Sequence, residues 1–158
     1  MTGDEIWRTL HLLSVFLYVG GLGAVLAPMY RAWRSKDVEV QMIAFRQAAD
    51  SETSLLLPGL ILTGVTGVFW AVSKDYNFIR DGWLGVLTLL YIFTTFIALP
   101  LLGLGLRRVR LLSLEAAKHQ RITPELEEAL ADNVPRVFGT VILILTPVMA
   151  WLAIVKPF

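Results

Sequence analysis

The sequence predicts an all-α membrane protein, a four-transmembrane-helix antiparallel bundle. Two observations predict it. Apolar residues make up 56% of the chain and charged residues only 17%, whereas soluble domains carry about 25% charged residues. The charges also lie in blocks, separated by stretches without Asp, Glu, Lys or Arg at residues 9–30, 53–73, 82–106 and 137–155. The 158 residues are therefore predicted to form a single transmembrane domain, residues 1–158.

Each of these stretches is long enough to cross the membrane as a helix, because a hydrocarbon core of roughly 30 Å needs about 20 helical residues. Helices satisfy every backbone amide within their own segment, which lipid requires. Asp4 and Glu5 precede the first stretch in place of a basic segment, so we expect this stretch to be a retained span. The tryptophans lie at or near the span ends, as an interfacial belt does: Trp7, Trp33, Trp70, Trp83 and Trp151.

Loop charge predicts the orientation of the bundle. The segments after the first and third spans hold ten of the 14 basic residues. These ten are Arg31, Arg34, Lys36, Arg46, Arg107, Arg108, Arg110, Lys118, Arg121 and Arg136. By the positive-inside rule these segments face the cytoplasm and both termini lie on the periplasmic or outer side. We expect a bacterial cytoplasmic (inner) membrane.

The connector at residues 111–133 contains the signature of a short cytoplasmic amphipathic helix between spans three and four. Thr123 is placed as an N-cap, Pro124 at the first helical position and Glu125 in the first turn. Leu126, Ala129 and Leu130 then share one helical face.

Small and hydroxylated residues inside the spans predict helix packing. Glycines allow helix backbones to approach closely, and threonines bond to carbonyls of their own or a neighbouring helix. The glycines are Gly20, Gly21 and Gly23 in span one and Gly64 and Gly67 in span two. Prolines 58, 100 and 147 are expected to mark helix ends or kinks.

His11 is the one ionisable side chain within the four charge-free stretches. Such residues are costly in lipid and are functional candidates by default. An imidazole just below the outer interface can ligate haem iron, relay a proton or hydrogen-bond a quinone. It can equally be a structural histidine that bonds to a neighbouring helix.

Several other kinds of site are excluded or disfavoured. The chain has no cysteine, which excludes thiolate metal sites and iron–sulfur clusters. His119 lies in a polar segment predicted on the side opposite His11, so the two histidines cannot clamp one haem. A single haem would need His11 and a Met, Tyr, Lys, water or partner histidine. No nucleophile–base set is visible, so no catalytic residues are assigned.

Short motifs in all four spans resemble a known family. Leu10-His11-Leu12-Leu13 with Gly20-Gly21 is similar to the first helix of the bacterial four-helix HemJ-type protoporphyrinogen oxidases and of their uncharacterised membrane-protein relatives. Three further pieces follow in the same order. They are Leu57-Pro58-Gly59 with Thr66-Gly67, Asp81-Gly82-Trp83-Leu84, and Asn133-Val134-Pro135 with the closing Lys156-Pro157-Phe158.

The resemblance implies that His11 binds haem b, because the first-helix histidine of that family is implicated in haem binding. A lysine that follows the third-span Trp-Leu pair in the family is absent. Here Trp83-Leu84 is followed by Gly85, Val86 and Leu87. The chain therefore resembles the uncharacterised relatives more closely than the oxidase.

Three functions follow as hypotheses. The first is a small membrane protein that binds haem b through His11, for electron transfer or haem handling. The second is a non-catalytic accessory subunit of a larger respiratory or photosynthetic complex, and the third is a protoporphyrinogen oxidase-like oxidoreductase. The expected partners are the lipid bilayer and a homodimer or larger membrane complex, with no nucleic acid.

Overall fold

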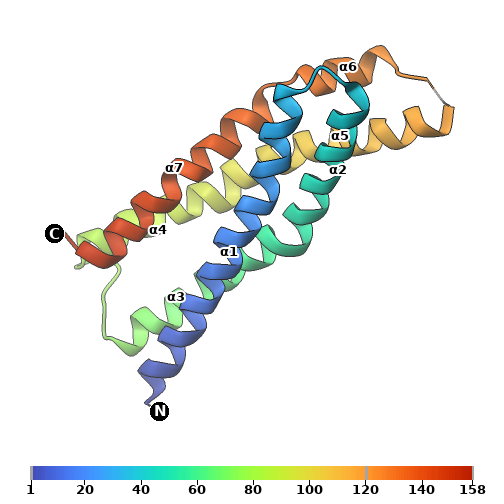
Figure 1. Ribbon diagram of the computed structural model, residues 1–158. Coiled ribbons are helices and arrows are strands. Elements are labelled where there is room, and N and C mark those ends of the chain that lie inside the picture. The colour runs from blue at the N-terminus through green and yellow to red at the C-terminus, as the bar shows by residue number, and fades with distance from the viewer. Residues whose placement is uncertain (1, 120, 158) are drawn as a thin grey trace.

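The computed structural model describes residues 2–119 and 121–157, which form helices and connections without a strand (Figure 1). Two of the membrane-crossing rods are composite, because a π-helical turn joins two α-helices without a break. The elements are α1 (Gly3–Arg34), α2 (Val38–Ser51), the π-turn η1 (Glu52–Leu56), α3 (Leu57–Ser73), α4 (Gly82–Phe93), the π-turn η2 (Thr94–Ala98), α5 (Leu99–His119), α6 (Pro124–Ala131) and α7 (Val134–Val155).

Four helical rods in the described chain are long and apolar enough to cross a membrane, which confirms the predicted fold class. The rods extend well beyond the charge-free stretches. α1 continues to Arg34, α2 precedes the second apolar stretch, and α5 continues to His119. The whole of the segment 111–119, expected to be connector, is therefore helix. Its Leu, Ala, Glu and Lys residues are all strong helix formers. Charged residues such as Glu and Lys interrupt an apolar stretch, but they do not end a helix.

The predicted amphipathic helix is α6. The Thr123 side chain accepts a hydrogen bond from the Leu126 backbone N–H at 3.3 Å, and Pro124 occupies the first helical position. Its apolar face is buried, as expected, through Leu126, Ala129 and Leu130.

None of the three prolines ends a helix. Pro58 and Pro100 each follow a π-turn by two residues, and Pro147 lies inside α7. A proline has no N–H to donate within the helix. At Pro58 and at Pro100, a π-turn lies just before the proline nitrogen that cannot donate a hydrogen bond. The helical rod continues through both prolines.

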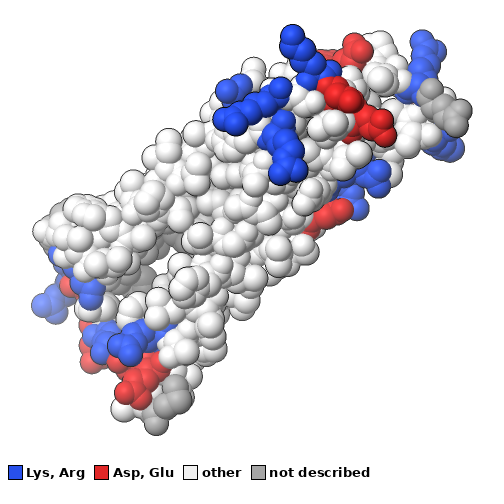
Figure 2. Space-filling model, in the orientation of Figure 1, with Lys and Arg blue, Asp and Glu red and all other residues white. Residues whose placement is uncertain are grey.

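The charged residues gather at the two ends of the bundle, with a broad uncharged band between them (Figure 2). We call the end with residues 2–8, 74–81 and 156 the terminal end. The end with residues 31–37 and 107–136 is the basic end.

The rods pack as two pairs, α1 with α3 and α4–η2–α5 with α7, and α2 joins the pairs through α5. The larger hydrophobic core includes α2, η1, α5 and α6 and lies toward the basic end. At the terminal end a small second cluster contains Ala71, Trp83 and Leu84. The surface there is hollowed between α1 and α7, whose ends diverge (Figures 1 and 2). We call this hollow the wedge.

The glycines divide into two groups. A Cβ on Gly21 would lie 2.6 Å from the backbone nitrogen of Leu56. A Cβ on Gly59 would lie 2.6 Å from the backbone nitrogen of Tyr18. α1 and the rod η1–α3 therefore touch backbone to backbone, as predicted for Gly21. Gly20 and Gly23 have no described neighbour within 4 Å of such a Cβ, so they do not serve packing within this chain.

Candidate functional site

His11 lies on α1 and its half-buried imidazole packs against α3. Its Nδ1 is 3.1 Å from the backbone carbonyl oxygen of Thr63 and 3.2 Å from Thr66 Oγ1. Thr63 and Thr66 are one turn apart on α3, so one turn of α3 holds the ring.

These contacts determine which nitrogen carries the proton. The Thr63 carbonyl oxygen can only accept. The Thr66 hydroxyl donates its own proton to the Leu62 carbonyl oxygen at 2.6 Å, so it too faces Nδ1 as an acceptor. Nδ1 must therefore be the donor, and in the neutral ring Nε2 keeps a free lone pair. Within the described part of the chain, the hydrogen bonds of the His11 ring all involve Nδ1, and no residue hydrogen-bonds Nε2.

Gly67 makes room for the ring. A Cβ at position 67 would lie 3.1 Å from His11 Cε1 and 3.3 Å from Nδ1. Gly67 shares its face of α3 with Gly64, which packs on the Tyr91 ring, and with Ala71, which clusters with Trp83 and Leu84 of α4. The imidazole thus covers the face of α3 that carries Thr63, Thr66 and Gly67, next to the face that packs on α4.

Side chains at the terminal end close over the imidazole. The Trp70 ring centroid lies 5.5 Å from that of His11, and Trp70 Nε1 donates to Asp4 Oδ1 at 3.0 Å. Lys74 Nζ pairs with Asp4 Oδ2 at 2.7 Å. The hydrogen bond from Lys74 is the main cause that holds the pKa of Asp4, outside the apolar stretch, below its ordinary value. We call Asp4, Trp70 and Lys74 the α1–α3 clamp.

A separate contact fastens the end of α7. The Lys156 ammonium lies 4.5 Å from the Tyr76 ring centroid and 5.3 Å from that of Trp83, and it also bonds the Tyr76 hydroxyl. Lys156 adopts a left-handed backbone conformation with φ of 48° to reach this place. The contact ties α7 to the α3–α4 connection and leaves the wedge between α1 and α7 unbridged.

Deeper in the bundle, tyrosine–threonine pairs join α1 to α7. Tyr18 and Thr146 share a hydrogen bond of 2.9 Å, and Tyr30 and Thr140 one of 2.8 Å. Thr140 and Thr146 also donate to carbonyl oxygens of α7 itself, as predicted for threonines within spans. The sequence places these hydroxyl groups within the spans, and in the structure they hold α1 and α7 together.

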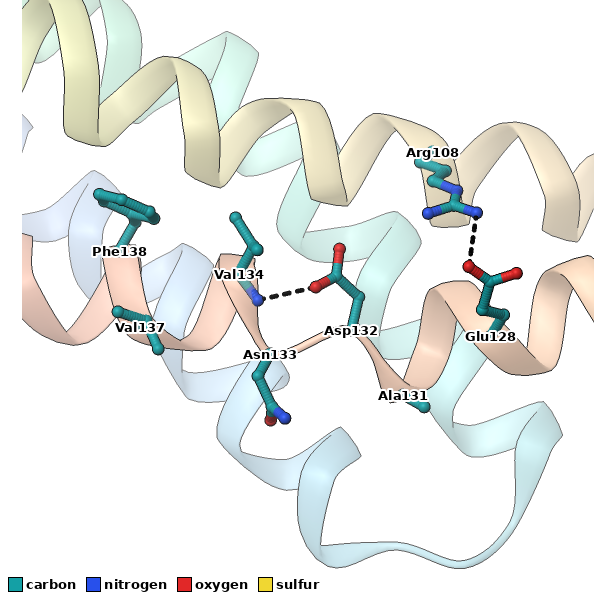
Figure 3. Close-up of a pocket in the computed structure, with 8 residues that line it drawn as sticks. All are labelled: Arg108, Glu128, Ala131, Asp132, Asn133, Val134, Val137 and Phe138. Carbon is teal, nitrogen blue, oxygen red and sulfur yellow. Dashed lines mark hydrogen bonds and ion pairs between the residues drawn. The ribbon is translucent and has the colours of Figure 1, made fainter.

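A hollow of about 660 Å³ lies at the basic end between α5, α6 and α7 (Figure 3). Arg108 points across it to Glu128, with 3.5 Å between NH2 and Oε1. Asp132 Oδ1 accepts from the Val134 backbone N–H at 2.9 Å. Each of these charges already has a partner, and the hollow is open to solvent, so it is a weaker candidate than His11.

His119 ends α5 at the basic end. His11 lies beside Trp70, toward the terminal end, so the structure does not bring the two histidines together. The described residues contain no group of three or more His, Cys, Asp or Glu side chains that could hold a metal ion. A metal at His11 must therefore bring most of its own ligands, as the iron of haem does through its porphyrin.

Comparison with known proteins agrees with this architecture. A family model of predicted integral membrane proteins, DUF2269, matches residues 5–157. The chain belongs to the DUF2269 family. No curated protein and no solved structure matches it. Membership of DUF2269 therefore supports the membrane class without assigning an activity.

Glu52 is a buried ionisable residue that the sequence-based prediction missed. It lies one residue before the charge-free stretch 53–73 and therefore outside the predicted span. In the structure it begins η1, with its side chain only 2% exposed. A carboxylate directly beside a charge-free stretch is the signal that could have identified it.

Proposed function

We propose that this protein binds one haem b through His11 Nε2 and serves electron transfer or haem handling in the membrane. The tautomer of His11 supports this function most directly. Metal-ligating histidines usually donate their other ring N–H to a carbonyl or carboxylate, which orients the ring and makes the ligating nitrogen more basic. The Thr63 carbonyl oxygen accepts from Nδ1 in this way.

Haem fits these residues better than a bare metal ion does. A lone neutral imidazole supplies one ligand, and porphyrin supplies four more. The methionines do not form a soft-ligand site that would suit copper. Met29 is fully buried in the core near the basic end, whereas Met149 is half-buried on α7.

The residues around His11 would each have a defined role. Thr63 and Thr66 orient the ring, Gly67 leaves space for it, and Trp70 covers its outer edge. When bound, the haem supplies one-electron redox chemistry. The protein determines the basicity of His11 Nε2 through the Thr63 carbonyl oxygen. The apolar side chains of the spans exclude water from the site.

The test is a reduced-minus-oxidised visible spectrum of protein purified in detergent from haem-replete cells. His11→Ala is expected to lose the Soret and α bands, while His119→Ala keeps them. Both variants are first checked for helix content, so that loss of fold is recognised. A featureless wild-type spectrum, or bands that survive in His11→Ala, would show that His11 is not the ligand.

A role as accessory subunit of a larger membrane complex has one specific observation in its favour. Gly20 and Gly23 of α1 face away from the bundle, with no described neighbour near them, and exposed glycines on a span suit close contact with another helix. Gentle solubilisation and native purification test this role. Co-purification of larger subunits, lost in a Gly20→Leu, Gly23→Leu variant, would support it.

A further inference from the structure

Glu52 is a buried carboxyl group in the interior of the bundle, separate from His11. It begins η1, in the middle of the continuous rod that α2, η1 and α3 form. The carboxyl group packs on α5 at Gly103, where a Cβ would lie 3.0 Å from Glu52 Oε1. A side chain at position 103 would therefore press on the carboxyl group, and glycine leaves room for it. π-turns such as η1 recur at functional sites.

The carboxyl group is incompletely satisfied. Oε2 is buried and has no hydrogen-bond partner. The Arg107 guanidinium stands 3.5 Å from it, as an ion pair without hydrogen-bond geometry. The Arg107 side chain is 53% exposed, whereas that of Glu52 is 2% exposed. Arg107 can therefore move into water at the basic end, but Glu52 has no such freedom.

Packing separates Glu52 from the terminal end. One turn further along the rod, Leu56 is fully buried and its backbone lies directly against Gly21 of α1. The route out past Arg107 leads to the basic end. Asp50 of α2, two residues before Glu52, pairs with Arg110 of α5 at 3.2 Å.

The geometry points to a proton-binding site at Glu52 that exchanges with the aqueous phase at the basic end and is controlled by Arg107. When Arg107 swings into water, the buried carboxylate loses the cation that pairs with it, and an unpaired buried charge is strongly unfavourable. The carboxylate then takes up one proton from water to become a carboxylic acid. When Arg107 returns, that proton leaves to water and the ion pair re-forms. Arg107 keeps its own charge throughout.

Infrared spectroscopy tests this site, because the carbonyl stretch of a protonated carboxyl group is separate from the carboxylate bands. Arg107→Gln is expected to gain one protonated carboxyl group per chain at neutral pH relative to wild type. The double variant Arg107→Gln, Glu52→Gln is expected to lose that band. The matched control Arg107→Gln, Asp50→Asn is expected to keep it, because Asp50 is exposed.

Isotope labelling keeps the test decisive if a double variant misfolds. In Arg107→Gln protein with carboxyl-¹³C glutamate, the new band shifts only if it belongs to a glutamate. Absence of a new band in Arg107→Gln would overturn the inference. So would a band that persists without Glu52 or that does not shift with the label. The inference is independent of haem, since none of these measurements involves His11.

Discussion

At the scale of single residues, the chemistry of His11 depends on its neighbours on α3. Because both neighbours of Nδ1 are acceptors, the lone pair is left on Nε2. The sequence identified His11 as the exceptional residue of the spans, but it could not show that Thr63 and Thr66 orient it. That information depends on how α1 and α3 are aligned.

Thr66→Val tests this orientation. Valine keeps the shape of threonine and removes one of the two acceptors of the Nδ1–H. We expect haem affinity to fall by about 10-fold, in the range found when outer-shell partners of metal ligands are lost. The measurement is a haem titration of apo-protein. Thr88→Val is the matched control, since Thr88 bonds only to the Leu84 carbonyl oxygen of its own helix. Equal affinities for the two variants would contradict the assigned role of Thr66.

Gly67→Ala tests the space beneath the ring. The new methyl group would press on His11 Cε1 from 3.1 Å, and we expect a loss of about 1 to 3 kcal/mol of stability, typical of overpacking. Gly23→Ala is the control, because open space surrounds that position and alanine is the better helix former. Denaturation in detergent measures both. A Gly67→Ala protein as stable as Gly23→Ala would refute the close contact.

At the scale of elements, charge distinguishes apolar stretches from loops but does not mark where helices end. The sequence predicted the four spans and the cap of α6 correctly. It missed the extensions of α1 and α5, because arginine, lysine and glutamate end a charge-free stretch and yet favour helix formation. The π-turns were also missed. Each precedes a Leu-Pro pair, Leu57-Pro58 or Leu99-Pro100, but the sequence alone reads these prolines as helix ends or kinks.

The α1–α3 clamp gives a pH-dependent prediction for these two elements. The pKa of Asp4 is lowered from 3.8 by its Lys74 contact. The stability it contributes is therefore fully present above that ordinary value and is lost as the pH falls through the lowered one. We expect the indole N–H resonance of Trp70 to move over that acidic window. Asp4→Asn should abolish the movement, and a movement that persists in it would exclude Asp4 as its cause.

At the scale of the whole molecule, the sequence predicted the number and antiparallel order of the spans. It could not predict which spans pack together. Pairing of α1 with α3 and of α5 with α7 follows from backbone contacts such as that of Gly21 with Leu56. Composition also gives no sign that the larger core lies toward the basic end or that the surface at the terminal end is hollowed.

The absence of cysteine allows the orientation of the bundle to be measured directly. A single cysteine at Ser73 marks the terminal end and one at Ala117 the basic end, and both positions are exposed. If the basic end faces the cytoplasm, as the positive-inside rule predicts, a membrane-impermeant maleimide labels Ser73→Cys in intact cells. It should label Ala117→Cys only after the membrane is permeabilised. The reverse pattern would invert the proposed orientation.

The most direct test of the central claim is nitrogen NMR of protein labelled with ¹⁵N-histidine, before and after addition of ferric haem. The chain has two histidines, so His119 serves as an internal reference. We predict a proton on Nδ1 and none on Nε2 of His11 in the apo-protein. Added haem should then shift or broaden the His11 Nε2 resonance and leave His119 unchanged. A proton on Nε2 of His11, or a His11 resonance indifferent to haem, would contradict the account.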